Sequence, residues 1–109
     1  QGGMGMAGSG EIGDEHAFFE PVHGSSPKYA GQNKVNPIAS INSIQMMMDW
    51  LGRKENNEDL IHVGEIIDES VAEHLKNNSQ LTYDLGGNAS CSDVGEAICE
   101  LVKARLIEL

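Results

Sequence analysis

The sequence has few basic side chains, few cysteines and no long apolar run. Its 7 lysines and arginines stand against 17 acids, for a formal net charge of −10, which repels a phosphate backbone and disfavours nucleic-acid binding. No apolar run approaches the roughly 20 residues that a membrane-crossing helix needs, so we expect no membrane insertion. Cys91 and Cys99 lack the spacing of metal ligands, which favours reduced thiols in a cytoplasmic protein.

Length and composition are those of one modest domain. The chain has 109 residues, of which 39% are hydrophobic, enough to bury a small core. It opens on Gln1 and Gly2 with neither an initiator methionine nor a signal-peptide pattern. We therefore expect it to be part of a longer protein.

The periodicity of the apolar residues predicts two short strands followed by three main helices. Strand patterns lie within residues 1–13 and at 17–19, and a loop rich in proline, glycine and serine follows up to Pro37. Apolar residues at helical spacing then predict one helix that ends at Gly52 and a second over about residues 58–75. Ser92 or Asp93 is expected to cap the last helix.

Residues 8–13 match the GxGxxG pattern of dinucleotide-binding Rossmann folds. That fingerprint requires a helix directly after the glycines. Here the following segment contains an aromatic pair, Pro21 and Gly24, which oppose a helix. We interpret the glycines as a strand and its end loop.

Residues 20–31 bring together groups that suit a nucleotide. Gly24 allows backbone amides to approach a phosphate, Ser25 and Ser26 offer hydroxyl groups, His23 offers a flat ring, and Lys28 supplies positive charge. From residue types alone, a phosphate site and a surface turn with a solvated lysine are about equally supported.

The motifs of the chain, taken together, resemble the isocitrate and isopropylmalate dehydrogenase family. The resemblance covers essentially the whole chain and rests on residues 12–14, 19–25, 27, 30–31, 36–37 and 82–87. It implies an α/β fold that is not of the Rossmann type. Residues 1–109 would form the carboxy-terminal nucleotide-binding part of the large domain.

The resemblance also implies an activity for the complete protein. The motifs are most similar to those of NADP-dependent isocitrate dehydrogenases of the tricarboxylic acid cycle. These enzymes oxidatively decarboxylate isocitrate to 2-oxoglutarate and carbon dioxide. They use Mg²⁺ or Mn²⁺ and act as homodimers. The alternatives are an isopropylmalate or homoisocitrate dehydrogenase, and a non-catalytic nucleotide-binding fragment. The residues at the cofactor do not read the variable part of the substrate, so the substrate stays open.

The same resemblance assigns cofactor contacts. Asn36 would bond the adenine edge, Asp84 would lie near the adenosine, and Glu20 would lie toward the nicotinamide ribose. Four residues of the loop after the second strand would lie against adenine, ribose and phosphate: His23, Gly24, Ser25 and Ser26.

The preference for NADP rests on Lys28 and Tyr29. NADP-dependent members typically carry this pair where NAD-dependent members carry an acid and an aliphatic residue, and a cation with a phenol suits a 2′-phosphate. Tyr83 matches another position near that phosphate. Gly87 replaces an arginine found there in bacterial NADP-dependent members, which leaves NADP favoured and NAD possible.

The family's catalytic groups belong to segments that precede this one, so we assign no catalytic or metal-binding residue here. The only arginines, Arg53 and Arg105, lie on predicted helices, and the chain alone is expected not to catalyse. We expect no chemistry from three histidines on polar faces, packing roles for the methionines and the tryptophan, and exposed apolar edges where missing strands would pair. These residues are His16, His62, His74, Met46, Met47, Met48 and Trp50.

Overall fold

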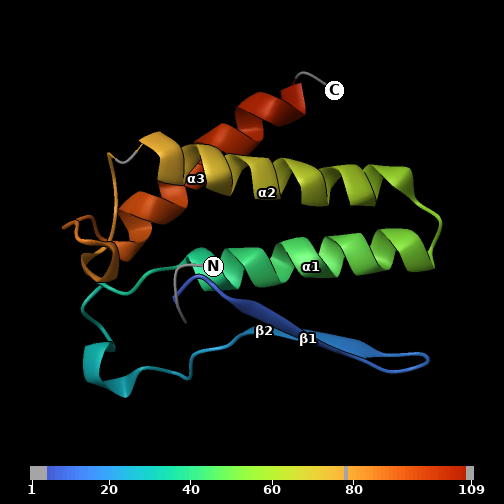
Figure 1. Cartoon of the computed structure of the whole chain (residues 1–109), viewed down its shortest axis with the longest axis horizontal. Coiled ribbons are helices and arrows are strands. Elements are labelled where there is room, and N and C mark those ends of the chain that lie inside the picture. The colour runs from blue at the N-terminus through green and yellow to red at the C-terminus, as the bar shows by residue number, and fades with distance from the viewer. Residues whose placement is uncertain (1–4, 78, 108–109) are drawn as a thin grey trace.

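The computed structural model describes residues 5–77 and 79–107. A β-hairpin leads into three helices (Figure 1). The elements are β1 (Gly8–Ile12), β2 (Ala17–Pro21), a 3₁₀ turn η1 (Pro27–Tyr29), α1 (Ile38–Lys54), α2 (Glu58–Asn77), a 3₁₀ turn η2 (Tyr83–Leu85) and α3 (Cys91–Ile107). This confirms the predicted two strands and three main helices in their predicted order; the part of the first strand pattern before residue 5 lies outside the described residues.

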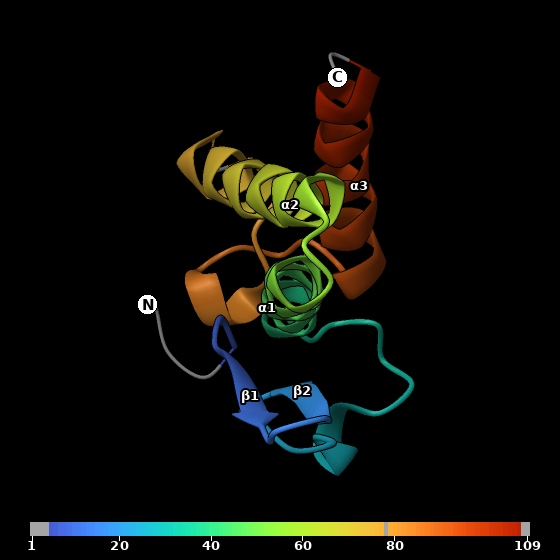
Figure 2. The ribbon, with the colours of Figure 1, turned by 90° about the vertical axis from the view of Figure 1, so that its right-hand side faces the viewer.

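The elements stack in layers, which Figure 2 shows end-on. The hairpin packs on α1, α1 packs on α2, and α2 packs on α3. The strands are antiparallel, with Gly8 opposite Pro21 and Ile12 opposite Ala17. The glycine motif thus forms a strand that turns directly into β2, as predicted, and not the helix entry of a Rossmann fold.

The core lies where α1, α2 and α3 converge. Ile38, Val71, Val94 and Ile98 are buried together there, and Met6, Ile41, Leu75 and Val102 pack around them. Burial of each such aliphatic side chain contributes about 1.5 to 3 kcal/mol. The predicted packing roles in α1 agree with the structure at Trp50, whose ring lies 6.1 Å from the Phe19 ring of β2.

The prediction that α1 ends at Gly52 is wrong. The helix continues to Lys54, and the Glu55 amide still donates to the Leu51 carbonyl at 2.9 Å. Gly52 is buried against the start of α2, where a β-carbon would lie 2.5 Å from Ile61 Cγ1. The glycine therefore serves a close helix–helix approach, and not a stop signal.

The prediction for the start of α3 is wrong in its capping residue. Ser90, and not Ser92, caps the helix: the Asp93 amide donates to Ser90 Oγ at 3.0 Å, and the Ser90 amide donates to Asp93 Oδ2 at 3.1 Å. This is the reciprocal capping-box arrangement, with aspartate in the usual place of glutamate. Asp93 acts within this cap, three residues after the capping position.

The prediction for His74 is also wrong in its placement. His62 and His16 are exposed, but His74 is only 4% exposed and its Nε2 lies 2.6 Å from the Gln80 carbonyl. The imidazole ties the end of α2 to the segment that leads into η2. A histidine bonded to backbone in this way has a structural role.

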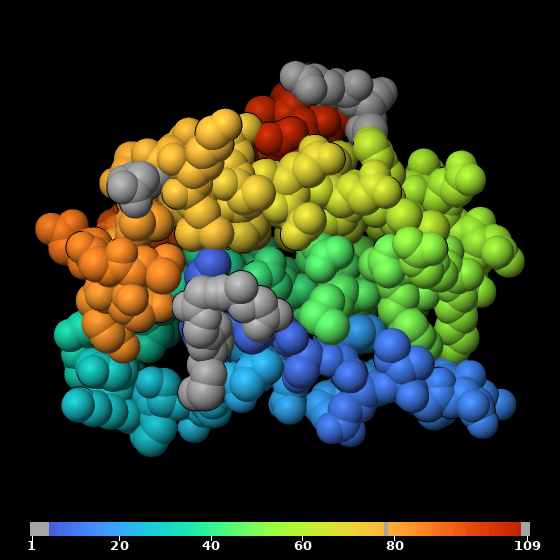
Figure 3. All heavy atoms as spheres, viewed as in Figure 1, coloured from blue at the N-terminus to red at the C-terminus, as the bar shows by residue number. Residues whose placement is uncertain are grey.

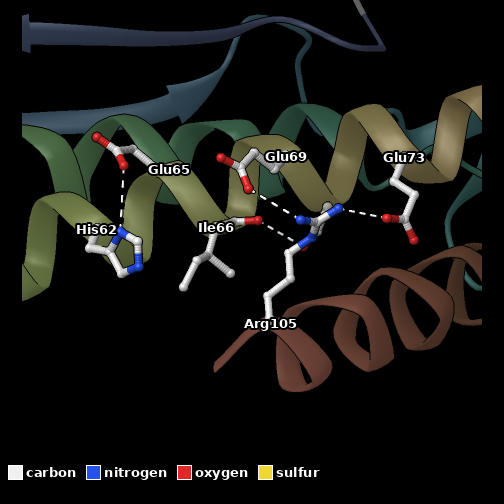
Figure 4. Close-up of polar contacts among 7 residues, drawn as sticks. His62, Glu65, Ile66, Glu69, Glu73 and Arg105 are labelled. Carbon is white, nitrogen blue, oxygen red and sulfur yellow. Dashed lines mark hydrogen bonds and ion pairs between the residues drawn. The ribbon is translucent and has the colours of Figure 1, made fainter. Parts of the chain in front are cut away.

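Arg105 joins α3 to α2 (Figure 4). Its guanidinium donates to Glu69 Oε2 at 3.2 Å and to Glu73 Oε1 at 2.6 Å. Within α2, the Ser70 hydroxyl donates to the Ile66 carbonyl at 2.7 Å. Half-exposed ion pairs add little stability individually, so the main effect of this fork is to fix the crossing of the two helices.

Several apolar side chains remain open on the surface. Ile12 and Phe18 of the hairpin, Val22 after it and Ile44 of α1 are exposed, consistent with the expected exposed apolar edges. Cys91 and Cys99 are free thiols. Within the described residues, none of the helices combines the length and apolar character that a bilayer crossing requires.

Candidate functional site

A pocket of about 340 Å³ opens at the end of the molecule where three segments meet. These are the lead into β1, the loop between β2 and α1, and the segment around η2. Figure 3 shows the last two side by side at the left, in teal and orange. The lining residues are Gly5, His23, Gly24, Ser26, Val35, Asn36, Tyr83 and Asp84.

The loop between β2 and α1 has a defined shape. Ser26 adopts the left-handed region with φ 50° and starts the η1 turn. Asn33 then fastens the loop to the start of α3: its side chain donates to Ser92 Oγ at 2.8 Å, and its carbonyl accepts from the Cys91 amide at 3.0 Å. The loop that lines the pocket is thereby held by a helix 59 residues further along the chain.

Two tyrosines and two lysines form a cluster at the rim of the pocket. The Tyr29 and Tyr83 rings lie 5.4 Å apart. Lys28 Nζ lies 5.4 Å from the centre of the Tyr29 ring, and Lys34 Nζ lies 5.1 Å from the centres of both rings. Partial desolvation, followed by the interaction with Tyr29, raises the pKa of Tyr83, so its phenol is a hydrogen-bond donor at neutral pH.

The Asp84 carboxylate is held from two sides. Thr82 Oγ1 donates to its Oδ1 at 2.5 Å, and Asn36 Nδ2 donates to its Oδ2 at 3.1 Å. Asn36 Oδ1 in turn accepts the amide of Ile38, the first residue of α1, at 2.9 Å. Thr82 and Asn36 are both buried, and together they fix an acceptor at the pocket wall.

We predict that Thr82→Val lowers the free energy of unfolding by about 1.5 kcal/mol. The substitution keeps the shape of the side chain but removes the hydroxyl that donates to the charged Asp84. Chemical denaturation measures the change, and Thr82→Ser, which retains the hydroxyl, is the matched control. Equal stability of the valine and wild-type proteins would show that this bond does not hold Asp84.

Gly87 is required by its surroundings. A β-carbon at this position would overlap the Leu81 carbonyl oxygen and lie 2.7 Å from the Leu81 carbonyl carbon. The backbone at residue 87 packs directly against the backbone at Leu81, and the Ala89 amide donates to the same Leu81 carbonyl at 2.9 Å. No side chain, and therefore no arginine, fits at residue 87 in this backbone.

The structure gathers six of the ten predicted cofactor residues in the pocket wall and places the remaining four outside it. Tyr29 lies at the rim beside Tyr83, and Lys28 lies beside Tyr29. Ser25 is exposed and outside the lining, and Glu20 lies on β2, where its carbonyl accepts the Ser9 hydroxyl at 3.1 Å. The six in the wall are His23, Gly24, Ser26, Asn36, Tyr83 and Asp84.

The contacts of two predicted residues differ from what residue type alone indicated. The side chain of Asn36 is hydrogen-bonded to Asp84 and to the first backbone amide of α1. His23 Nδ1 lies 2.7 Å from the Gly24 carbonyl, which leaves the ring face beside the pocket. The sequence analysis did not select Lys34 or Val35 as site residues. The only signal for them in the sequence is that they immediately precede Asn36.

Metal-binding side chains are not grouped in the described part of the chain. Among residues 5–77 and 79–107, histidine, cysteine and acidic side chains form no cluster of three or more with the geometry for an ion. What the described residues provide is a pocket of about 340 Å³ with basic and aromatic side chains at its rim.

Known proteins match this chain over most of its length. Residues 1–98 match the Isocitrate/isopropylmalate dehydrogenase family. The chain is 44% identical to the homoisocitrate dehydrogenase of Methanocaldococcus jannaschii over 96% of its length, and 42% identical to the isocitrate/homoisocitrate dehydrogenase of Thermus thermophilus over 94%. It spans 28% of the length of each of these relatives.

The fold has close counterparts among solved structures. The apo β-decarboxylating dehydrogenase of Thermococcus kodakarensis superposes with a TM-score of 0.84 at 39% identity, covering 96% of this chain and 29% of that one. The isocitrate dehydrogenase of Methylococcus capsulatus gives a TM-score of 0.81 at 32% identity, covering 93% and 28%. The resemblance seen in the motifs and the predicted partial fold are both confirmed: the chain belongs to the isocitrate/isopropylmalate dehydrogenase family.

Proposed function

We propose that this chain forms the adenosine side of the cofactor site in an NADP-dependent isocitrate dehydrogenase. The complete enzyme would convert isocitrate to 2-oxoglutarate and carbon dioxide. The observation that carries the proposal is the pocket: six of the ten residues selected from the sequence line it, and the Lys28-Tyr29 pair lies at its rim. In this proposal residues 1–109 are the carboxy-terminal nucleotide-binding part of the large domain.

The groups that line the pocket fit the adenosine half of the cofactor. A volume of about 340 Å³ falls within the range of small-molecule pockets, roughly 300 to 1,000 Å³. The His23 ring and Val35 provide flat and apolar surface for adenine, and the fixed Asp84 carboxylate provides an acceptor for a hydroxyl or amino group. Gly24 and Ser26 leave room for a phosphate to approach the backbone.

The rim supports the phosphorylated form of the cofactor. Lys28, the Tyr29 phenol and the protonated Tyr83 phenol are donors that suit a 2′-phosphate. When bound, the nicotinamide end of the cofactor accepts the hydride of the substrate's secondary alcohol. The residues of this chain would hold and orient the distant adenosine end, which contributes binding energy and not proton transfer.

Other features of the complete enzyme belong to the same proposal. Mg²⁺ or Mn²⁺ would act as a Lewis acid on the β-keto acid, held by residues outside this chain. We further propose a cytoplasmic homodimer whose remaining segments cover the exposed apolar side chains of the hairpin.

A second function is supported by the relatives themselves. One relative is a homoisocitrate dehydrogenase and another is a 3-isopropylmalate/3-methylmalate dehydrogenase, 44% and 40% identical to this chain. A relative from Dictyostelium discoideum belongs to an NAD isocitrate dehydrogenase. Because the proposed pocket meets the cofactor and not the substrate, the same geometry would serve a homoisocitrate or isopropylmalate enzyme.

Steady-state kinetics on the complete protein tests the proposal. Isocitrate, homoisocitrate and 3-isopropylmalate would each be supplied with NADP or NAD and a divalent metal, and production of reduced cofactor would be followed. The proposal expects the highest kcat/KM with isocitrate and NADP. A higher value with another acid, or with NAD, would overturn the substrate or the cofactor assignment separately.

We predict that His23→Ala in the complete enzyme raises the KM for NADP about fivefold and leaves kcat nearly unchanged. The ring offers one stacking contact, worth about 1 kcal/mol, and uniform binding of this kind affects KM alone. His62→Ala, which removes an exposed histidine of α2 away from the pocket, is the control. A collapse of kcat with unchanged KM would assign His23 a chemical role instead.

A further inference from the structure

Lys34 occupies a central place in the rim cluster. Its ammonium group lies 5.1 Å from the centre of the Tyr29 ring and 5.1 Å from that of the Tyr83 ring, whereas Lys28 approaches Tyr29 alone. The next residues along the chain, Val35 and Asn36, line the pocket. The backbone therefore brings Lys34 to the same rim as Lys28, from further along the same loop.

The loop holds Lys34 at this place firmly. Asn33, directly before it, makes two side-chain bonds and one backbone bond to the start of α3. Asn36, two residues after it, is anchored by Asp84 and Ile38. The backbone on both sides of Lys34 is thus held in place, which lowers the entropic cost of using its ammonium group in binding.

Residue 87, where the resemblance to NADP-dependent members would place an arginine, cannot carry a cation here. A β-carbon at Gly87 overlaps the Leu81 carbonyl oxygen, so the backbone excludes any longer side chain at that position. This chain has a formal charge of −10, which opposes an anionic ligand unless local cations compensate. The ion pairs among the described residues give Lys34 no carboxylate partner.

We propose that Lys34 is a specificity-determining residue that supplies the second positive charge for the 2′-phosphate of NADP, in place of a side chain at Gly87. The inference rests on the proposed use of NADP and names a residue that this use requires. The paired phenols of Tyr29 and Tyr83 orient the ammonium group through their ring faces, and the phosphate would be met by Lys28 and Lys34 from two sides. NAD lacks that phosphate, so its binding would not depend on Lys34.

The alternative is that Lys34 serves only to hold the two tyrosine rings together. A structural lysine of this kind would affect NADP and NAD alike, because both dinucleotides share the adenine and ribose. The two roles therefore differ in how the loss of Lys34 divides between the cofactors.

The experiment measures KM and kcat for NADP and for NAD in the complete enzyme with Lys34→Gln, Lys34→Arg and Lys103→Gln. Lys103 is an exposed lysine of α3 paired with Glu100, so its replacement removes the same charge away from the pocket. We expect Lys34→Gln to raise the KM for NADP about fivefold at low salt, with the KM for NAD and both kcat values unchanged. Lys34→Arg should restore most of the loss, and Lys103→Gln should have no effect.

Each other outcome overturns a definite part of this inference. An equal rise for NADP and NAD, or failure of arginine to rescue, would assign Lys34 the structural role. An unchanged KM for NADP in Lys34→Gln would remove Lys34 from the site. A wild-type enzyme that prefers NAD would instead overturn the proposed function, which distinguishes that failure from the failure of Lys34. Thermal unfolding of each variant checks that the fold is retained.

Discussion

Lys28→Asp combined with Tyr29→Ile in the complete enzyme is expected to shift the ratio of kcat/KM values from NADP toward NAD by roughly a hundredfold. A shift of this size corresponds to about 2.7 kcal/mol. It combines two effects: loss of a charge-assisted contact to the 2′-phosphate, and repulsion of that phosphate by the new carboxylate. The same carboxylate would pair with the ribose hydroxyls of NAD.

The structure explains why these two residues should act together. Lys28 Nζ lies 5.4 Å from the centre of the Tyr29 ring, and that ring lies 5.4 Å from the Tyr83 ring. Removal of the Tyr29 ring also removes the interaction that, after partial desolvation, raises the pKa of Tyr83. The double substitution therefore changes both the charge of the rim and the support of its second phenol.

Steady-state kinetics with each cofactor varied at saturating substrate measures the shift. Lys54→Asp is the matched control, because Lys54 lies at the end of α1, where it donates to the Glu15 carbonyl, away from the pocket. A ratio that stays at its wild-type value in the double variant would show that Lys28 and Tyr29 do not select the cofactor.

Gly87→Ala is expected to lower the free energy of unfolding by about 3 kcal/mol, at the upper end for an overpacked site. Its β-carbon would overlap the Leu81 carbonyl oxygen and lie 2.9 Å from Leu81 Cβ. Backbone atoms form most of this obstruction, so no rotation of a side chain relieves it. The segment must shift, and Thr82, whose carbonyl accepts the Gly87 amide at 3.0 Å, would shift with it.

Gly95→Ala provides the control for this prediction. Gly95 lies within α3, and a β-carbon there would meet no atom within 4 Å. Alanine is the better helix former by about 1 kcal/mol, so this variant should be as stable as the wild type or more so. Chemical denaturation of both variants makes the comparison. If Gly87→Ala proved as stable as Gly95→Ala, the backbones at residues 81 and 87 would not be in tight contact. An arginine could then be accommodated at residue 87.

The local signals in the sequence predicted the elements well. The strands, the start of α1 after Pro37 and the extent of α2 follow from apolar spacing and turn residues, since these depend on neighbours a few positions away. The two boundaries that were predicted wrongly have different causes. Gly52 is a glycine because α2 packs against it, which no local pattern indicates. Ser90 and Asp93 are only three residues apart, so the capping box at the start of α3 is a local signal that the prediction of Ser92 or Asp93 as the cap overlooked.

The sequence by itself determined the family and the residues to consider at the proposed cofactor site, because motifs at fixed spacing are a property of the chain alone. Only the tertiary structure decided how those residues act together. It brought part of the loop over residues 23–36 together with Tyr83 and Asp84 around one pocket. It also bonded the Asn36 side chain to Asp84 and to α1, and placed the Lys34 ammonium group near two tyrosine rings. It also showed why Gly87 cannot be an arginine. The physical reason is that contacts between segments some 50 residues apart depend on how α1, α2 and α3 pack, and no local pattern encodes that packing.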